Sequence, residues 1–321
     1  MAERKVIADR RRIGGSDLVV TGVGIGTWSW GDKKFWTYGE DFDRKDIDRV
    51  WRRALELGVS WFDTAEIYGD GASETIIGEL LAKEKARPPM IATKIYPEGK
   101  SLASVRKAAQ GSLKRLGLDI IDLYQVHWPP TKMPLGDLMR EMEGLVDDNL
   151  VANIGVSNFS VAEVEEAQGA MQHAKIASNQ VHYSLLHREP EDDGLVEHHR
   201  KAGITIIAYS PLEQGLLTGK FTPAHTPGGF RSSKPRFSPE NLKRARPLLD
   251  TLANIGRDNG RTMGQAALAW LLKDPNVVVI PGAKNLKQLE DDVGCADWLL
   301  TGKELDRIER AYHEYREAGG V

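Results

Sequence analysis

An alternation of two kinds of segment constrains the fold of this chain more than any other feature. From residue 20 onward, short apolar runs suited to β-strands alternate with longer segments of helical period. Each pair takes about 30 residues, the length of a β-α-β unit in a parallel sheet. Eight such runs can be counted, and the strands are expected to end at or near Gly26–Trp28, Trp61–Asp63, Ile91–Lys94, Leu123–His127, Ile154–Ser157, Gln180, Ile206–Tyr209 and Val277–Pro281.

The segments between these runs carry helix signals. In Arg44–Leu57, apolar residues recur at three- and four-residue spacing, and Gly58 follows as a C-cap. Ser101 is placed to cap a second helix that ends at Leu116, before Gly117. Because no linker-like Pro/Ser tract interrupts residues 20–220, the pattern favours a closed (β/α)8 barrel. An open, doubly wound sheet is the alternative.

Three pieces fall outside the eight units. Arg10–Ile13 and Leu18–Thr21 flank a Gly-Gly-Ser turn, which predicts a hairpin that plugs one end of the barrel. Residues 218–238 are rich in Gly and Pro and are long enough to be a functional loop. A last helix is expected at Gly302–Ala318. The sequence therefore predicts an α/β protein, a TIM barrel with an N-terminal β-hairpin and an extra C-terminal helix, as one domain over residues 1–321.

The composition excludes several classes of protein. Of the residues, 41% are hydrophobic and 28% are charged, which is ordinary for a folded domain and unlike a disordered chain. A net charge of −3 gives no positive field that would attract nucleic acid or anionic lipid. No apolar window approaches the roughly 20 residues of a membrane span. We therefore expect neither a nucleic-acid partner nor a membrane partner.

The cysteine content and the N-terminus bear on the compartment. The single cysteine, Cys295, allows no intrachain disulfide and is expected to be a small packed residue. Only a short apolar stretch follows Met1–Lys5, which lacks the apolar core of a secretory signal. Both observations favour a cytoplasmic protein.

Polar residues stand where the predicted strands end. In a (β/α)8 barrel the interior is packed with side chains, so chemistry is confined to the C-terminal ends of the strands and the loops after them. A polar side chain in an apolar run is costly unless it is paired. The residues in question are Asp63, Lys94, His127, Ser157, Asn158, Gln180, Tyr209, Ser210 and Lys284. They are expected to converge on one rim.

The segment Asp63-Thr64-Ala65-Glu66-Ile67-Tyr68-Gly69, with Ser73-Glu74 after it, resembles the signature of the aldo-keto reductase superfamily. The similarity continues in order through Ala92–Lys94, Leu123–Trp128, Gly155–Phe159, Asn179–Val181, Ala208–Leu212 and Ile280–Lys284. Any one block is weak evidence, but together they cover the barrel. Gln214–Lys220 is similar to the bacterial and potassium-channel β-subunit-like branches.

Reduction of a carbonyl needs a hydride on carbon and a proton on oxygen. The resemblance implies that Tyr68 is the general acid, that Asp63 pairs with Lys94, and that His127 shares hydrogen bonds with Tyr68 and the substrate oxygen. A Lys94 ammonium beside the phenol would favour the phenolate, so we expect the pKa of Tyr68 to lie below its usual value. Taken singly, Asp63 could be a helix cap, Tyr68 a packed aromatic and His127 a loop residue.

The resemblance also implies a nicotinamide cofactor. Tyr209 resembles the residue that stacks on the ring, and Ser157, Asn158 and Gln180 resemble the contacts to its carboxamide. The remaining cofactor contacts, to the phosphates and the adenosine, are predicted at Ser210, Pro211, Leu212, Gly215, Leu217, Thr218, Gly219, Lys220, Pro281, Gly282, Ala283, Lys284, Gln288, Asp291 and Asp292.

The choice between NADPH and NADH depends on residues that follow the last predicted strand. Lys284 stands where the family usually contacts the 2′-phosphate, which favours NADPH. Gln288 stands at a position that is often Arg, and Asp291-Asp292 stands where Glu-Asn is common, so NADH is the alternative.

Two other motifs, a dinucleotide fingerprint and a zinc site, are rejected. Gly22–Gly26 is not followed by a helix as a Rossmann fingerprint requires, and the histidines have no zinc spacing, so no metal is predicted.

The predicted activity is NAD(P)H-dependent reduction of aldehydes or ketones to alcohols, with a small carbonyl compound as partner. Trp28, Trp30, Trp36 and Trp128 lie in loops after strands and predict an aromatic pocket, with Trp28 and Trp128 as its walls. Packing of the long loops is the alternative explanation. Two other functions compete: a cofactor-binding regulatory module of the channel β-subunit type, and a barrel lyase or isomerase that uses Lys94 as a Schiff base.

Overall fold

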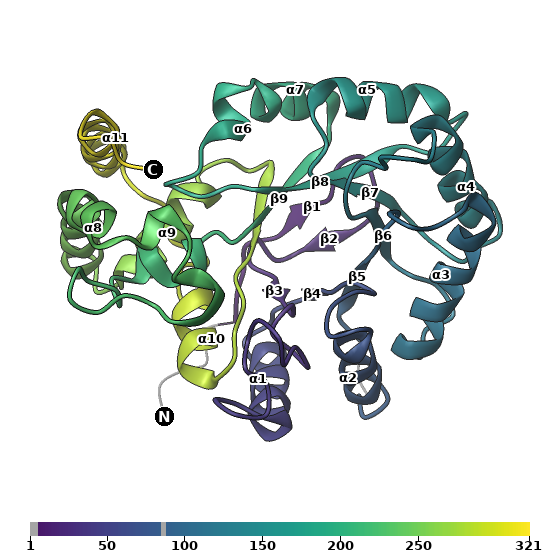
Figure 1. Ribbon diagram of the computed structural model, residues 1–321, viewed down its shortest axis with the longest axis horizontal. Helices are drawn as coiled ribbons and strands as arrows, with labels where there is room; N and C mark the ends of the chain where they lie inside the picture. The colour runs from purple at the N-terminus through teal and green to yellow at the C-terminus, as the bar shows by residue number, and fades with distance from the viewer. Residues whose placement is uncertain (1–5, 85–87) are drawn as a thin grey trace.

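Eight parallel strands form the centre of the molecule (Figure 1). The computed structural model describes residues 6–84 and 88–321, so Met1–Lys5, part of the argument against a secretory signal, lies outside the described residues. Hydrogen bonds join neighbours in chain order from β3 to β10. The strands are β3 (Ile25–Gly26), β4 (Trp61–Asp63), β5 (Met90–Ile95), β6 (Leu123–Val126), β7 (Ile154–Ser157), β8 (Ile176–His182), β9 (Thr205–Tyr209) and β10 (Val277–Ile280).

The sheet closes between its first and last strands. Val23 pairs with Val279 and Gly26 pairs with Gly282, both in parallel. The backbone N–H of Gly24 donates to Val279 O at 2.9 Å, and the N–H of Val279 donates to Gly22 O at 2.9 Å. The closed barrel is therefore confirmed, and the open sheet is excluded.

The helices lie around the outside of the strands (Figure 1). They are α1 (Arg44–Glu56), α2 (Ala72–Leu81), α3 (Leu102–Leu116), α4 (Leu135–Asp147), α5 (Val161–Ala170), α6 (Glu189–Asp192), α7 (Leu195–Ala202), α8 (Pro239–Asp258), α9 (Met263–Leu272), α10 (Leu286–Val293) and α11 (Gly302–Glu317). The predictions for α1, α3 and α11 are confirmed to within a residue or two at each end. Gly58 has φ 84° beyond α1, and Gly117 has φ 66° beyond α3, so both end a helix in the left-handed region.

The N-terminal hairpin plugs the barrel, as predicted. Its strands, β1 (Arg11–Arg12) and β2 (Val19–Val20), pair antiparallel. Ile13 and Val20 are fully buried and belong to a core cluster with Trp61, Leu123 and Val278 from the barrel strands. The plug covers the end at which the strands begin, which leaves the opposite end for a site.

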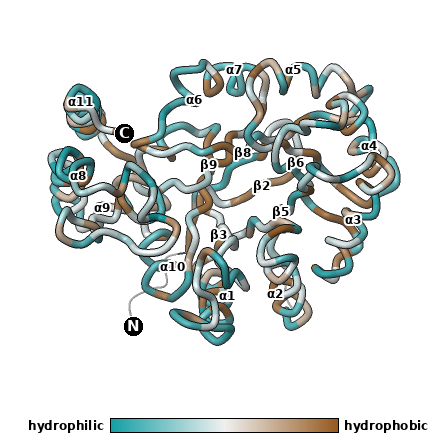
Figure 2. The backbone as a smooth tube through the Cα atoms, in the orientation of Figure 1, coloured by the Kyte–Doolittle hydropathy of each residue, from teal (hydrophilic) through white to brown (hydrophobic). Residues whose placement is uncertain are grey.

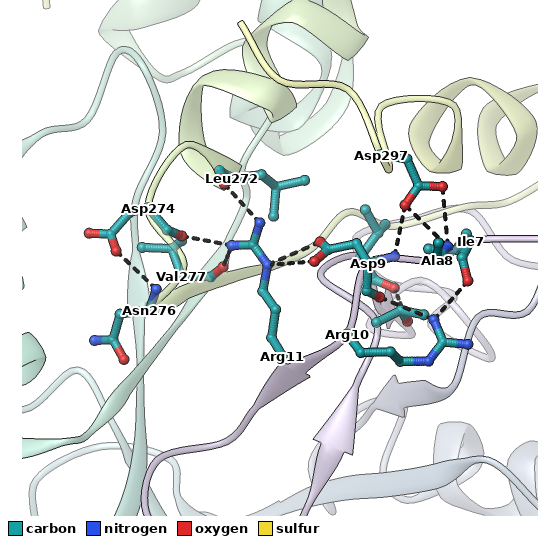
Figure 3. A network of polar contacts seen from close by, with 12 residues as sticks. Ile7, Ala8, Asp9, Arg10, Arg11, Leu272, Asp274, Asn276, Val277 and Asp297 are labelled. Atoms are coloured by element: carbon teal, nitrogen blue, oxygen red, sulfur yellow. Dashed lines mark hydrogen bonds and ion pairs between the residues drawn. The ribbon is translucent and has the colours of Figure 1, made fainter.

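A polar network ties the hairpin and the segment before it to the last unit of the barrel (Figure 3). The Arg11 guanidinium donates to the backbone oxygens of Asp274 (2.7 Å), Val277 (2.5 Å) and Leu272 (2.8 Å). It also pairs with Asp9 at 3.0 Å. The Asp297 carboxylate accepts from the backbone N–H of Asp9 at 2.7 Å.

Hydrophobic stretches run along the strands, whereas α1 and α8 are largely hydrophilic (Figure 2). This is the pattern of a barrel whose helices face solvent on one side. Cys295 is fully buried, and burial raises the pKa of its thiol, in agreement with the packed role expected for it. Among the described residues, no helix is long and apolar enough to cross a membrane.

Candidate active site

A cavity of about 960 Å³ opens at the C-terminal ends of the strands. Residues at or near the ends of several strands line this cavity, among them Gly26 on β3, Asp63 on β4, Ser157 on β7 and Gln180 on β8. Loops after β3, β9 and β10 complete the wall. All the predicted rim residues except the buried Lys94 line this one cavity. It has room for a ligand larger than a simple carbonyl compound.

A buried ion pair lies at the floor of this cavity. The Lys94 ammonium donates to Asp63 Oδ1 at 2.5 Å, to the backbone oxygen of Thr64 at 2.8 Å and to the Tyr68 hydroxyl oxygen at 3.2 Å. The side chains of Lys94 and Asp63 are 0% and 2% exposed. A charge this deep is tolerable because every N–H of the ammonium has an oxygen partner. Tyr68 itself lines the cavity.

The second oxygen of Asp63 is also engaged. Gln125 Nε2 donates to Asp63 Oδ2 at 3.0 Å, and Gln180 Nε2 donates to the same oxygen at 2.8 Å. Gln125 and Gln180 are buried. The sequence interpretation included Gln125 in a motif but gave it no place in the site. Gln125 lies near the end of β6, two residues before His127. This polar residue in a buried strand could have indicated a place in the site.

His127 meets Tyr68 edge-on, with ring centroids 5.7 Å apart. Burial, reinforced by the nearby Lys94 charge, lowers the pKa of His127 to about 3. The imidazole is therefore neutral at physiological pH, so it can donate one hydrogen bond but is no acid. Its Nδ1 is buried and has no hydrogen-bond partner among the described residues.

The pKa of Tyr68 differs from the sequence expectation. Burial raises this pKa, and although the Lys94 charge lowers it, the Asp63 charge raises it again. The expected lowering is therefore wrong for the protein by itself: full burial of the phenol outweighs an ammonium whose charge Asp63 largely neutralises. Tyr68 is consequently protonated at neutral pH.

The residues predicted to hold the nicotinamide are joined to one another. Asn158 Nδ2 donates to His127 O and to Ser157 Oγ, both at 3.0 Å. The Tyr209 hydroxyl donates to Asn158 Oδ1 at 3.0 Å, and Ser157 Oγ donates to the backbone oxygen of Gln180 at 2.8 Å. All four predicted residues line the cavity beside Tyr68.

The loop after β9 forms a tight turn in the 3-10 segment η1 (Glu213–Thr218). Ser210, Glu213 and Gln214 all have φ near 50° and Gly215 has φ 98°, so the chain folds sharply back on itself. Most of the predicted phosphate and adenosine contacts line the cavity: Ser210, Pro211, Leu212, Gly215, Thr218, Lys220, Pro281, Gly282, Lys284, Gln288, Asp291 and Asp292.

Three predicted cofactor contacts do not reach the cavity wall. Leu217 and Ala283 are fully buried in the core. The backbone N–H groups of Leu217 and Gly219 donate within the turn, to Leu212 O at 3.2 Å and Leu216 O at 3.0 Å. These donors, which the sequence interpretation assigned to the cofactor, are already used within the 3-10 turn.

Five cationic residues line the cavity: Lys220, Arg231, Lys234, Lys284 and Lys287. Burial lowers the pKa of Lys284 to about 8, and the Arg231 charge adds to the effect. Burial and then Arg231 likewise lower the pKa of Lys220 and of Lys234. Asp32 and Asp41 partly offset the repulsion at Lys284, and Asp292 partly offsets it at Lys220. The cluster of cations is suited to an anion. Arg231 and Lys234, which the sequence interpretation missed, lie in the Gly/Pro-rich segment, where their charges were the available signal.

Aromatic rings surround the entrance. The Trp28 ring lies 6.3 Å from Tyr68 and 6.0 Å from Phe230 between centroids, and the Trp36 ring lies 5.3 Å from Phe230. Trp28, Trp36 and Trp128 line the cavity. Trp30 does not: it is fully buried and its indole N–H donates to Ala283 O at 3.0 Å, so the grouping of Trp30 with the pocket residues is wrong.

A model of the aldo/keto reductase family matches residues 22–313. The chain belongs to this family. An uncharacterized oxidoreductase of Mycobacterium tuberculosis is 40% identical over 297 residues, which cover 92% of this chain and 91% of the relative. The NADH-specific methylglyoxal reductase of Escherichia coli is 30% identical over 327 residues, covering 93% and 98%. This aldo-keto reductase is thus an oxidoreductase with relatives that use NAD(P)H.

Solved structures agree with the fold. The glycerol dehydrogenase of Gluconobacter oxydans matches with a TM-score of 0.86 and 28% identity, over 96% of each chain. An aldo/keto reductase of Klebsiella pneumoniae, solved with NADP and acetate, matches with a TM-score of 0.77 and 26% identity over 95% of this chain and 96% of that one. These structures confirm the barrel of this aldo-keto reductase.

Proposed function

We propose that this aldo-keto reductase reduces aldehydes and ketones to alcohols and that Tyr68 is the general acid. The observation that carries the proposal is the Tyr68 hydroxyl, which lines the cavity and lies 3.2 Å from the buried Lys94 ammonium. Family membership supports the reaction class. A bound nicotinamide supplies the hydride to the carbonyl carbon.

The chain's own residues then move the proton. As negative charge develops on the carbonyl oxygen, Tyr68 transfers its hydroxyl proton to it, and the resulting phenolate lies beside Lys94. Asp63 holds Lys94 in place, at 2.5 Å, so the ammonium need not reorganise when the phenolate forms. His127, neutral because its pKa is about 3, donates a ring N–H to the same substrate oxygen.

The residues present fit a dinucleotide. Tyr209 offers a ring, Ser157, Asn158 and Gln180 offer hydrogen-bonding groups, and cationic side chains line the same cavity. We assign NADPH because Lys220, Arg231 and Lys284 repel one another, and a 2′-phosphate would relieve that repulsion. The NADP-bound structure from Klebsiella pneumoniae supports this assignment, while the NADH-specific relative from Escherichia coli represents the alternative.

The aromatic rings around the cavity indicate which class of substrate it would accept. Trp28 lies between Tyr68 and Phe230, and Trp128, with 47% of its surface exposed, lines the cavity. A flat or apolar body attached to the carbonyl would bury its surface against these rings. We therefore propose aromatic and apolar aldehydes as the preferred substrates.

Tyr68→Phe tests the proposed acid. We expect the kcat for reduction of 4-nitrobenzaldehyde by NADPH to fall by about 10²- to 10⁴-fold, the usual contribution of a general acid. The Kd for NADPH, measured by fluorescence titration, should stay within about twofold of wild type, a change of roughly 0.4 kcal/mol. Tyr38→Phe, which removes a hydroxyl from a ring packed on Phe42, is the matched control. Retention of a tenth of the wild-type kcat by Tyr68→Phe would refute the assignment.

A further inference from the structure

Two amide side chains meet the same carboxylate oxygen beneath the cavity. Asp63 Oδ2 lies 3.0 Å from Gln125 Nε2 and 2.8 Å from Gln180 Nε2. A carboxylate only accepts hydrogen bonds, so each amide must turn its nitrogen toward Asp63. The chemistry of the partner therefore fixes both amide orientations.

The second N–H of Gln180 is also committed. Gln180 Nε2 lies 3.2 Å from Gln125 Oε1, to which it donates. Both donors of the Gln180 amide thus point into the protein, and its Oε1 makes no hydrogen bond with any described residue. Gln180 lines the cavity beside Ser157 and Asn158. It consequently offers the cavity an acceptor and no donor.

We propose that Gln125 is a positioning residue: by sharing Asp63 with Gln180 and accepting from Gln180, it couples the orientation of the carboxamide-binding amide to the ion pair beneath Tyr68. The inference rests on the proposed function of Tyr68 and of the carboxamide contacts, which it deepens. Gln180 Oε1 then reads the NH₂ group of the nicotinamide carboxamide. The same amide network balances part of the Asp63 charge.

The charges around Tyr68 determine in which direction the loss of Gln125 would change the pKa of this phenol. Burial is the main cause that raises the pKa of Tyr68, Lys94 lowers it, and Asp63 raises it. His127 is neutral, and the Tyr209 hydroxyl carries no charge at neutral pH because burial raises its pKa to about 12. Removing the Gln125 N–H would leave more of the Asp63 charge unbalanced. The pKa of Tyr68 should therefore rise further.

Cofactor analogues test the orientation of Gln180 without any turnover. The thionicotinamide analogue of NADP⁺ keeps the NH₂ group, whereas the 3-acetylpyridine analogue replaces it with a methyl group. By fluorescence titration of the wild type, the thio analogue should bind within about threefold of NADP⁺. The acetyl analogue should bind at least about tenfold weaker, because one hydrogen bond of roughly 1.4 kcal/mol is lost and Gln180 Oε1 is left unpaired. Equal binding of the acetyl analogue would overturn the proposal.

The variant Gln125→Met tests the coupling, because Met has nearly the same length and volume but neither a donor nor a strong acceptor. The preference for NADP⁺ over the acetyl analogue should narrow by about threefold, since Asp63 still holds one N–H of the Gln180 amide while the second N–H loses its acceptor, Gln125 Oε1. In the oxidation of benzyl alcohol by NADP⁺, which needs the phenolate, the rising limb of the pH profile should move up by about 0.5 to 1 pH unit.

Gln168→Met is the matched control. The Gln168 side chain donates to Ala174 O at 3.0 Å and accepts from the N–H of Ile176 at 2.9 Å, on the outer layer of the barrel. This variant loses two hydrogen bonds yet should keep the wild-type pH profile and analogue preference. If Gln125→Met does not fold, Gln125→Glu serves instead, because it sets a second carboxylate against Asp63. Its rising limb in the pH profile should lie at a still higher pH than that expected for Gln125→Met.

The outcomes separate the two proposals. An unchanged pH limb together with an unchanged analogue preference in a folded Gln125 variant would overturn the role of Gln125. An active Tyr68→Phe with normal analogue discrimination would overturn the proposed acid and leave the amide orientation intact.

Discussion

At the scale of single residues, Lys94 shows how this barrel keeps a charge in its interior. Burial alone would lower the pKa of Lys94, but the Asp63 charge, together with the hydrogen bonds to Asp63 and Tyr68, raises it overall. The lysine therefore stays an ammonium with no exposed surface. A permanent cation at this place favours any negative charge that forms on Tyr68, which is what proton donation requires.

The Lys284 ammonium is the residue on which the cofactor assignment depends most directly. A charge-assisted hydrogen bond to a phosphate contributes about 1.5 to 3 kcal/mol, so Lys284→Ala should weaken NADPH binding by roughly ten- to a hundredfold. NADH, which lacks the 2′-phosphate, should lose much less. Fluorescence titration with both cofactors measures this, with the exposed Lys303→Ala as control. Equal losses for NADPH and NADH would show that Lys284 does not read the 2′-phosphate.

The residues that could be predicted from the sequence are those that end strands. Lys94 and Gln180 both meet Asp63 because parallel strands bring their C-terminal ends together. Gln125 and Arg231 were missed because their importance lies in what they face, which only the folded chain determines. The raised pKa of Tyr68 was missed for the same reason: sequence spacing placed Lys94 nearby but could not supply the degree of burial.

At the scale of elements, the segment from Gln214 to Phe237 crosses the entrance of the cavity. It holds two further 3-10 turns, η2 (Gly229–Arg231) and η3 (Pro235–Phe237). At its start, Glu213 accepts from Ser184 Oγ at 2.6 Å and pairs with Arg236, which joins the two ends of the segment. In the middle, Phe230 packs against Trp28 and Trp36. The sequence predicted a functional loop from Gly and Pro content, but not these anchors, which depend on long-range contacts.

We propose that this segment is a lid that closes over the cofactor phosphates. Lysine and arginine side chains on it face the cavity, so NADPH should order it and protect it from trypsin at the bond after Arg231. Limited proteolysis followed by mass spectrometry measures the rate of cutting with and without saturating NADPH. Phe230→Ala, which removes the ring contacts to Trp28 and Trp36, should be cut faster in both conditions. Cutting of the wild type at the same rate with and without NADPH would contradict the lid.

At the scale of the whole molecule, the barrel depends on the seam between its first and last strands. Gly22, Gly24 and Gly26 lie along this seam, and the pattern resembles a dinucleotide fingerprint only superficially. A Cβ on Gly24 would lie 2.2 Å from the Trp61 ring, and a Cβ on Gly26 would lie 2.8 Å from Ile280 O. Close packing therefore explains Gly24, which lies against the Trp61 ring of β4, and Gly26, which lies against Ile280 at the closure. The sequence excluded a Rossmann site correctly, but the reason for the glycines required the closed barrel.

The seam is reinforced from outside by Arg11, which ties the hairpin to the turn before β10 (Figure 3). Its side chain is 10% exposed, and it serves three backbone oxygens and Asp9. Arg11→Ala would leave those oxygens without their donor, so we expect the free energy of unfolding to fall by about 2 to 4 kcal/mol in urea titrations.

Arg12 provides the matched control for this prediction. It lies on the same hairpin strand, but its side chain is 57% exposed and its partner Asp17 is fully exposed. Arg12→Ala should therefore change the urea midpoint little, as expected for a surface ion pair. Because the Arg11 network lies at the end where the strands begin, the Kd for NADPH should be unchanged in both variants below the unfolding transition. Equal urea midpoints for Arg11→Ala and Arg12→Ala would show that the seam holds without this network.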